Sequence, residues 1–273
     1  MLEPMRDPQA KPHILAIANQ KGGVGKTTTA INLGTALAAL GHRVLLIDLD
    51  PQGNASTGLG VPSAERDFTS YDLLFDKDEP VQATETLVPN LRLIPATSDL
   101  SSADVDMVAD PRRLHKMEDA LGANVIDLVL QDYILIDCPP SLNLLTINAL
   151  VAADSVLVPL QCEFFALEGL SQLMRTVQSV RATSNHRLRI QGIVLTMFDR
   201  RNNLSGQVAA DVRETLGTLV YDTIIPRNVR LSEAPSHAMP ALIYDHASSG
   251  SVAYQKLAGE LLARMGGQAV EPA

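Results

Sequence analysis

A glycine-rich segment with a lysine at each end is the feature that most limits how this chain can fold. Residues 19–28 read Asn-Gln-Lys-Gly-Gly-Val-Gly-Lys-Thr-Thr, and they lie between an apolar run and an amphipathic run. Glycines let the backbone curl so that successive N–H groups point at one anion, and the following helix adds the positive end of its dipole. A strand, a phosphate-binding turn and a helix in this order favour an α/β fold.

The two lysines of the segment predict two different tasks. We expect Lys26 to neutralise β- and γ-phosphate oxygens and the hydroxyl of Thr27 to take one magnesium position. The usual pattern has glycine where this chain has Gln20, followed by Lys21. Lys21 is a second cation at the mouth of the loop, and it could reach a nucleotide held by a facing copy. Lys-Thr-Thr after Gly25 breaks the Gly-x-Gly-x-x-Gly pattern and disfavours a nicotinamide or flavin enzyme.

The rest of the chain alternates short apolar runs with longer amphipathic ones. This alternation is typical of a doubly wound, mostly parallel sheet with helices on both faces. Strands are predicted at His13–Ala18, Arg43–Asp48, Leu91–Pro95, Tyr133–Asp137, Ser155–Pro159, Arg189–Thr196 and Val220–Ile224. Helices are predicted at Thr27–Leu40, Pro111–Gln131, Leu142–Ala152, Ala166–Ser184, Ser205–Leu216 and Gly250–Met265. We expect a flexible leader over 1–12, one domain over 13–266 and a flexible tail over 267–273.

Three aspartates end or follow predicted strands. Asp48 and Asp50 follow an apolar run, and Asp137 ends another. The carboxyl ends of parallel strands face the ligand crevice, where the glycine-rich loop also lies. We expect Asp137 and Asp48 to support magnesium, directly or through water, with Asp48 alternatively supporting the loop, and Asp50 to orient the attacking water. Water is the expected phosphoryl acceptor, and slow hydrolysis would act as a timer.

Composition narrows the class of protein. Apolar residues make up 46% of the chain and charged residues 19%, which fits a globular protein. The sequence shows no membrane-spanning run and no apolar signal core, so a cytoplasmic location is expected. Cys138 and Cys162 are too few for a disulfide framework or a zinc site. The absence of tryptophan argues against a stacking platform for single-stranded nucleic acid.

The net charge of −9 disfavours a polyanionic partner, but the charge is unevenly distributed. Residues 187–230 hold seven arginines and four acids, a local charge of +3, which leaves −12 for the remainder. A solvated surface explains such a cluster as readily as a binding surface does.

Four separated motifs carry a resemblance to a known family. They are Lys-Gly-Gly-Val-Gly-Lys-Thr-Thr at 21–28, Leu-Ile-Asp-Leu-Asp-Pro-Gln-Gly-Asn at 46–54, Ile-Asp-Cys-Pro-Pro-Ser at 136–141, and Ile-Pro-Arg-Asn-Val-Arg-Leu-Ser-Glu-Ala-Pro-Ser at 225–236. In this order they closely resemble the ParA/Soj partition ATPases, whose P-loop departs from the usual pattern in the same way. The resemblance extends over residues 13–265.

The resemblance implies a magnesium-dependent ATPase whose ATP-bound form is a sandwich dimer. Lys21 would contact the partner's nucleotide, Asp50 would align the water, and Pro226 and Asn228 would line the adenine. The nucleotide site would comprise Lys21, Gly22, Gly23, Val24, Gly25, Lys26, Thr27, Thr28, Pro226 and Asn228, with Lys21, Lys26 and Asp50 as its catalytic residues.

The same resemblance implies binding to double-stranded DNA without sequence preference, and therefore nucleoid association. A ParB-type centromere-binding protein would stimulate hydrolysis and release the DNA. Arg201 and Arg230 match the family's DNA-contacting positions, and Arg200 is a further candidate. Arg227 could instead form a salt bridge near the adenine. The leader is too short for a helix-turn-helix domain, so sequence-specific autorepression is not expected.

Three alternatives share the scaffold. A membrane-cycling ATPase of the MinD kind would end in a basic amphipathic helix, whereas residues 254–267 contain few cations. An iron–sulfur carrier would use Cys138 and Cys162, but neither belongs to a Cys-x-x-Cys pair. A metabolic ligase would show turnover that depends on a small acceptor rather than on DNA and a protein.

Overall fold

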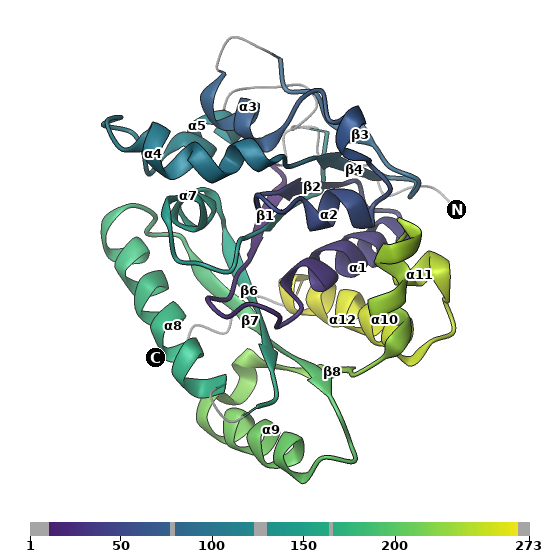
Figure 1. Ribbon diagram of the computed structural model, residues 1–273. Coiled ribbons are helices and arrows are strands. Elements are labelled where there is room, and N and C mark those ends of the chain that lie inside the picture. Colours follow the sequence, from purple (N-terminus) through teal and green to yellow (C-terminus); the bar gives the residue numbers. More distant parts are fainter. Residues whose placement is uncertain (1–10, 77–79, 123–129, 164–165, 267–273) are drawn as a thin grey trace.

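An eight-stranded sheet forms the centre of the computed structural model, which describes residues 11–76, 80–122, 130–163 and 166–266 (Figure 1). The strand order is β3-β4-β2-β5-β1-β6-β7-β8. The strands are β1 (His13–Ile17), β2 (Val44–Asp48), β3 (Thr84–Glu85), β4 (Leu91–Ile94), β5 (Tyr133–Asp137), β6 (Ser155–Gln161), β7 (Arg189–Phe198) and β8 (Val220–Pro226). Every neighbouring pair is parallel except β3 with β4. The predicted doubly wound fold is confirmed.

Helices cover both faces of this sheet (Figure 1). The longer ones are α1 (Lys26–Ala39), α5 (Lys116–Gly122), α7 (Leu144–Ala152), α8 (Ala166–Thr183), α9 (Asn203–Leu216) and α12 (Ser249–Gly266). Short helices are α2 (Asn54–Gly58), α3 (Ser70–Phe75), α4 (Ala103–Met107), α10 (Val229–Glu233) and α11 (Ala241–Tyr244). Among the described residues, no helix is long and apolar enough to cross a membrane.

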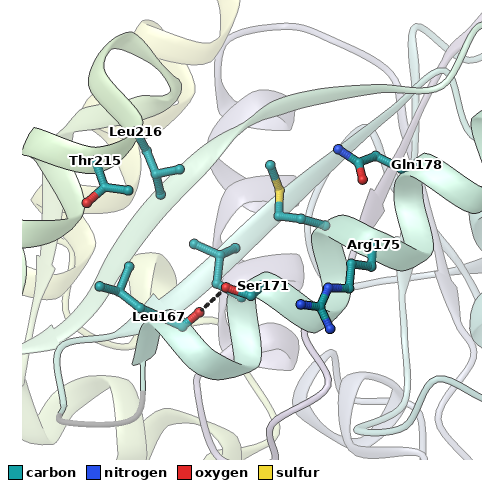
Figure 2. A pocket seen from close by; sticks show the side chains of 8 residues that line it. Leu167, Ser171, Arg175, Gln178, Thr215 and Leu216 are labelled. Carbon is teal, nitrogen blue, oxygen red and sulfur yellow. Dashed lines mark hydrogen bonds between the residues drawn. The ribbon is translucent and has the colours of Figure 1, made fainter.

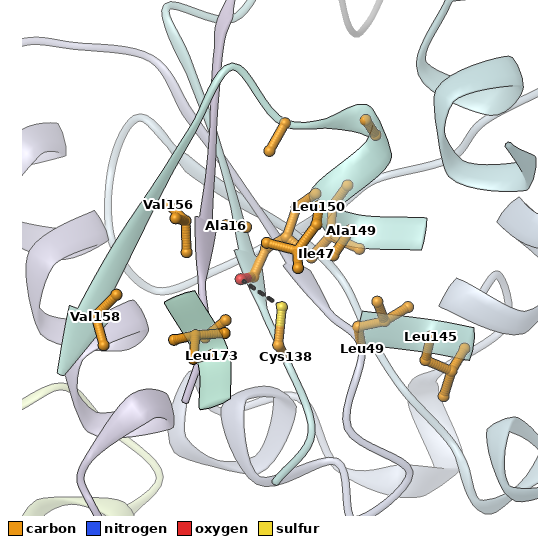
Figure 3. Close-up of a cluster of buried hydrophobic side chains, with 14 of the residues drawn as sticks. Ala16, Ile47, Leu49, Cys138, Leu145, Ala149, Leu150, Val156, Val158 and Leu173 are labelled. Atoms are coloured by element: carbon orange, nitrogen blue, oxygen red, sulfur yellow. Dashed lines mark hydrogen bonds between the residues drawn. The ribbon is translucent and has the colours of Figure 1, made fainter. Parts of the chain in front are cut away.

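Alternate residues of the central strands pack into two separate cores. In β2, Leu45 and Ile47 face the core under α7 and α8, and Val44 and Leu46 face the core under α1 and α12. The whole strand is buried, as a parallel sheet with two covered faces requires. Figure 3 shows the first core, where Leu145, Ala149 and Leu150 of α7 lie near Ile47 and Cys138.

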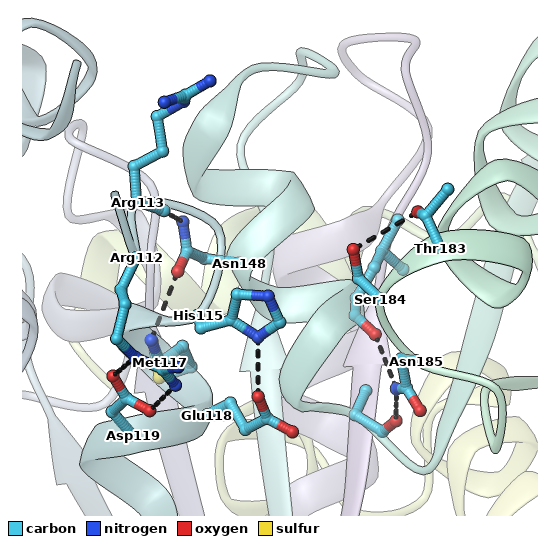
Figure 4. Close-up of polar contacts among 12 residues, drawn as sticks. Arg112, Arg113, His115, Met117, Glu118, Asp119, Asn148, Thr183, Ser184 and Asn185 are labelled. Atoms are coloured by element: carbon cyan, nitrogen blue, oxygen red, sulfur yellow. Dashed lines mark hydrogen bonds and ion pairs between the residues drawn. The ribbon is translucent and has the colours of Figure 1, made fainter. Parts of the chain in front are cut away.

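Buried asparagine side chains fix the helices on that face. The Asn148 amide of α7 donates to the carbonyl oxygen of Arg113 at 2.7 Å and accepts from the backbone N–H of Met117 at 3.2 Å, which ties α5 to α7 (Figure 4). Asn185, which follows α8, donates to the carbonyl oxygens of Leu150 and Ala153. These bonds satisfy polar groups that the core would otherwise leave unpaired.

Most predicted elements form within two residues of the expected bounds. β6, β7 and β8 each run two residues further than predicted. The predicted helix over Pro111–Gln131 forms as α5 over Lys116–Gly122, and residues 123–129 lie outside the described part of the chain. β3 and the short helices were not predicted, because segments of two to six residues carry too little periodicity. The predicted leader and tail fall largely on residues outside the described ranges, so those boundaries stay predictions.

Candidate functional site

The carboxyl ends of β1, β5 and β2 lie side by side at one edge of the sheet. Ile17, the last residue of β1, pairs with Asp137, and Asp137 pairs in turn with Asp48 of β2. The glycine-rich loop leaves the same edge directly after β1. The topology therefore brings the loop, Asp48 and Asp137 together, as the sequence predicts.

Positive φ angles shape the loop between β1 and α1. Gly23 has φ 75° and Gly25 has φ 86°, in the left-handed region that favours glycine. Gly25 is also the N-cap of α1, and no side chain caps that helix end. The first N–H groups of α1 are therefore available to an anion at the mouth of the loop.

Lys26, the first residue of α1, is buried and only 6% exposed. Its Nζ donates a hydrogen bond to the carbonyl oxygen of Lys21 at 3.0 Å. Burial lowers the pKa of Lys26, and the negative charge of Asp137 opposes that shift. A buried cation at the start of a helix is a strong site for phosphate oxygens. Thr27 and Thr28 follow it in the first turn and are partly buried.

Lys21 has different surroundings. Its side chain is 43% exposed, and its Nζ forms an ion pair with Glu163, which follows β6. Glu163 was not among the residues predicted for the site. An acid at or just beyond the end of a buried strand is the signal that identified Asp137 and Asp50, and it could also have identified Glu163. The predicted strand ends at Pro159, which places Glu163 four residues beyond the strand.

The Asp48 carboxylate is fully buried and already satisfied by the chain. Its Oδ2 accepts from the backbone N–H of Ser56 at 2.8 Å and from the Ser56 hydroxyl at 2.7 Å. Desolvation raises the pKa of Asp48 to about 6, although the hydrogen bonds from Ser56 act to lower it. These contacts hold the start of α2 and the turn after β2, and none of them involves the glycine-rich loop, so the predicted support of magnesium waters or of that loop stays a prediction.

Asp137 is also fully buried, but neither of its oxygens meets hydrogen-bond geometry with the described residues. Burial and the charge of Asp48 raise its pKa well above the usual range, while Thr27 and Lys26 favour its charged form. A buried carboxylate with unsatisfied oxygens, beside a threonine hydroxyl, suits an octahedral Mg²⁺ that keeps several waters. These residues therefore fit the predicted magnesium site.

Asp50 lies two residues beyond β2 and is 8% exposed. Its Oδ1 accepts from the backbone N–H of Gln52 at 3.0 Å, and its carbonyl oxygen accepts from Gly53. The side chain is thus held in a tight turn at the edge that carries the glycine-rich loop, in a position compatible with the predicted task at the attacking water.

The residues predicted to line the adenine lie at and just beyond the end of the edge strand β8. Pro226 is the last residue of β8, and Asn228 is the N-cap of α10. The Asn228 side chain accepts from the backbone N–H of Arg230 at 2.8 Å and donates to the hydroxyl of Ser249 at 2.7 Å. Asn228 therefore fixes the start of α10, and its place at the adenine stays a prediction.

The candidate DNA-contacting arginines lie on two segments that leave adjacent strands. Arg200 and Arg201 follow β7, and Arg230 lies in α10 beyond β8. The backbone N–H of Arg227 donates to the carbonyl oxygen of Phe198 at 2.9 Å, which joins the two segments. Arg201 is 89% exposed, and its guanidinium forms two hydrogen bonds with the Asp199 carboxylate. These bonds lower the pKa of Asp199 to about 2.

Arg230 is likewise exposed and paired, with Glu233 at 2.8 Å and with Asp245 at 3.3 Å. A side chain of β7 contacts the glycine-rich loop: the hydroxyl of Thr196 donates to the carbonyl oxygen of Val24 at 2.9 Å. Met197, the next residue, has φ 52°, which is unusual for a side chain of this kind. Strand β7 therefore contacts the glycine-rich loop and leads into the segment that carries Arg200 and Arg201.

Both cysteines are buried as free thiols. Burial raises the pKa of Cys138 far above its usual value and that of Cys162 to about 11. Neutral buried thiols of this kind behave as small apolar residues. Within the described ranges, no three His, Cys, Asp or Glu side chains gather as a metal cluster would require.

A shallow pocket between α8 and α9 is lined mainly by Leu167, Leu170, Met174 and Leu216, with Arg175 at its side (Figure 2). Its lining contains neither the glycine-rich loop nor any of the three aspartates. This pocket is therefore separate from the candidate nucleotide site at the sheet edge.

The chain is similar to proteins of known name over nearly its whole length. The family model of the AAA domain matches residues 12–190. The chromosome partitioning protein ParA of Caulobacter vibrioides is 60% identical, covering 92% of this chain and 94% of that protein. The sporulation initiation inhibitor protein Soj of Bacillus subtilis is 52% identical, covering 92% and 98%.

A solved structure shares the fold. The cobyrinic acid a,c-diamide synthase of Mycobacterium smegmatis, with bound ADP and magnesium, is 35% identical and superposes with a TM-score of 0.81. The superposition covers 96% of this chain and 98% of the other.

Proposed function

The chain belongs to the ParA/Soj family of chromosome-partitioning ATPases, and on that premise we propose that it is an ATP-gated switch that holds and releases DNA. ATP and ADP with Mg²⁺ are its ligands, in keeping with the ADP and magnesium of the M. smegmatis structure. Water is the phosphoryl acceptor, and the products are ADP and phosphate.

The chemistry is a matter of positioning and charge. The N–H groups of Gly22–Gly25 cradle the phosphates, and the Lys26 amine neutralises their oxygens. Thr27 and Asp137 would hold Mg²⁺ directly or through its waters, and the ion would supply positive charge at the β- and γ-phosphate oxygens. Asp48 holds the start of α2 through Ser56. Asp50 orients the water that attacks the γ-phosphate.

The difference between the two lysines is the observation that carries the proposal. Lys26 is 6% exposed and faces inward, whereas the Lys21 side chain is 43% exposed on the outside of the same loop. Because Lys26 already neutralises the phosphates bound to its own protomer, the exposed Lys21 amine is not needed for them. We infer that Lys21 reaches the nucleotide of a second copy, so that ATP joins two protomers in a sandwich dimer.

DNA binding follows from the dimer. Arg201 and Arg230, with Arg200 as a further contact, present cations on segments that leave neighbouring strands. Two copies double the number of phosphate contacts, which are independent of sequence and strongly dependent on salt. The contact between Thr196 and the glycine-rich loop gives a physical route by which the nucleotide state reaches these segments. The protein would then associate with the nucleoid only in its ATP-bound state.

Release requires hydrolysis, and we propose that a ParB-type centromere-binding protein stimulates it. Phosphate release should be slow for the protein alone and should rise when random-sequence duplex and a ParB-type partner are added together. Separate additions of DNA and of the partner serve as controls. A rate unchanged by both additions would contradict the proposed cycle.

A metabolic ligase is the second candidate, favoured by one observation, the 35% identity to the M. smegmatis synthase. The 60% identity to the partition protein of C. vibrioides weighs against it. The two functions separate in one assay: ligase turnover should depend on a small carboxylic acid and an amide donor and should ignore duplex DNA.

A further inference from the structure

Three exposed cations that the proposed function uses are paired with carboxylates of their own chain. The pairs are Lys21 with Glu163, Arg201 with Asp199, and Arg230 with Glu233. In the two arginine pairs the acid is a close neighbour in sequence. Lys21 and Glu163, by contrast, come from opposite halves of the chain and meet only because β1 and β6 are adjacent strands.

The backbone holds Glu163 firmly at the end of β6. Its N–H donates to the carbonyl oxygen of Gln161 at 2.9 Å, and its own carbonyl oxygen accepts from Ala166, the first residue of α8, at 2.9 Å. The Glu163 side chain is 31% exposed, and its Oε1 is shielded from solvent where it meets Lys21. The contact is an ion pair without the geometry of a directed hydrogen bond.

The same strand also fixes the backbone of Lys21. The Asn19 amide donates to the carbonyl oxygen of Pro159 in β6 at 2.7 Å, and its Oδ1 accepts from the backbone N–H of Lys21 at 3.0 Å. The start of the glycine-rich loop is thus anchored on β6 through both its backbone and its lysine head group. The carbonyl oxygen of Lys21 meanwhile accepts from Lys26, so the backbone stays in place if only the side chain leaves.

The Lys21 amine cannot form an ion pair with Glu163 and contact a partner's phosphate at the same time. When the side chain reaches outward, the Glu163 carboxylate loses its counter-ion while it remains partly shielded from water, which is unfavourable. That carboxylate also stays beside the start of the glycine-rich loop, where the proposed dimer would bring the partner's triphosphate, and like charges repel. Both effects oppose formation of the dimer.

We propose that Glu163 is a positioning residue that retains Lys21 on its own protomer and sets the protein concentration at which ATP joins two copies. The inference rests on the proposed ATP-dependent dimer. The Lys21–Glu163 ion pair is broken in both protomers when the dimer forms, so its free-energy contribution enters the dimerisation equilibrium twice.

The test compares the full-length wild type with Glu163→Gln, which keeps the size of the side chain and removes its charge. The dimerisation midpoint is measured by analytical ultracentrifugation with saturating Mg²⁺ and a non-hydrolysable ATP analogue. Glu163→Gln should lower the midpoint about three- to tenfold, because a partly exposed pair is released twice. The affinity of the single protomer for ADP should stay at the wild-type value. Glu168→Gln, an exposed acid on α8, is the matched charge control and should leave the midpoint unchanged.

A second comparison separates this inference from a merely structural effect. In a Lys21→Gln background, which should lose the dimer, Glu163→Gln should not restore it, because no lysine is left to reach the partner's nucleotide. A raised midpoint in Glu163→Gln would mean that the acid prepares Lys21 for its partner, and an unchanged midpoint would mean that the pair has no part in assembly. Either result overturns the inference. A wild type that forms no dimer with the analogue would instead overturn the proposed function itself.

Discussion

The amine of Lys26 donates a hydrogen bond to the carbonyl oxygen of Lys21, so one lysine of the glycine-rich loop holds the backbone of the other at 3.0 Å. The two side chains then point to different environments, one buried and one largely exposed. This arrangement allows the two lysines to be separated by experiment, because each can be removed while the loop glycines are kept.

Lys26→Ala should abolish nucleotide binding, whereas Lys21→Ala should retain it and lose the dimer. The physical reason is that Lys26 is the buried cation at the phosphates and Lys21 the exposed one. Isothermal titration with ATP analogue and Mg²⁺ measures the first effect, with an expected loss of at least about a hundredfold for Lys26→Ala, typical of removing a buried charged partner. Equal loss of affinity in both variants would contradict the division of tasks.

Asp50→Ala should bind ATP and stay on DNA as a dimer. Removing the carboxylate takes away the group that orients the water, while the phosphate-binding contacts of the loop are kept. We expect phosphate release to fall by about a hundredfold or more and the lifetime on immobilised duplex to lengthen accordingly. Single-turnover hydrolysis and dissociation from a DNA-coated surface measure the two effects. Rapid dissociation together with unreacted ATP would show that release does not await hydrolysis.

Asp199→Asn should strengthen binding to random-sequence duplex, and Arg201→Glu should abolish it. Asp199 holds the Arg201 guanidinium through two hydrogen bonds, so a DNA phosphate must compete with it. Because the pKa of Asp199 is lowered to about 2, this competition is constant across the neutral range, and DNA affinity should not vary between about pH 6 and 8 on its account. The measurement is fluorescence anisotropy across a salt titration with the ATP analogue present.

The salt titration supplies the control for these DNA variants. Arg201→Ala should reduce the slope of log affinity against log salt by about one for each DNA phosphate that the arginine neutralises in the wild type. Arg112→Ala, which removes an exposed arginine paired with Asp119 on α5, should leave both slope and affinity unchanged. An Arg201→Glu variant that binds duplex like the wild type would place the DNA surface elsewhere.

Asp48 should make the stability of the nucleotide-free protein depend on pH. Its pKa is raised from 3.8 to about 6 in the folded state, so the folded chain binds its proton more tightly than the unfolded chain does. The contribution of Asp48 to stability is therefore greatest below about pH 4 and is lost as the pH rises through about 6. Compared with Asp48→Asn, the wild type should lose up to about 3 kcal/mol of unfolding free energy between about pH 4 and 7.

Urea unfolding of both proteins in a metal chelator, at several pH values, measures this difference. The absolute effect of Asp48→Asn includes the loss of an acceptor for Ser56, so only the change with pH is diagnostic. A difference between the two proteins that stays constant over the range would contradict the assigned pKa shift.

Much of the fold was predictable because long elements repeat their pattern many times. β5 has the predicted bounds, α8 ends one residue early, and α1 begins and ends one residue early. β3, by contrast, consists of Thr84 and Glu85 alone and exists because β4 offers an open edge. Two residues carry too little sequence pattern to predict such a pairing.

The residues of the candidate site also fall into a predictable group and an unpredictable group. Asp137 and Lys26 were predictable because each belongs to a motif whose chemistry is local, a strand end and a phosphate loop. The partners of Asp48 and Lys21 were not, since Ser56 and Glu163 reach these residues only through the three-dimensional packing of the chain. The candidate site residues therefore follow from local sequence, and the residues that contact them follow from the fold.

One measurement tests the central claim most directly: the mass of the protein by light scattering, taken together with its binding to labelled random duplex, without nucleotide, with ADP, and with ATP. A protein that doubles its mass and gains DNA affinity only with ATP is the predicted result. A chain that remains a monomer while it hydrolyses ATP, or that binds duplex equally well without nucleotide, would contradict the account.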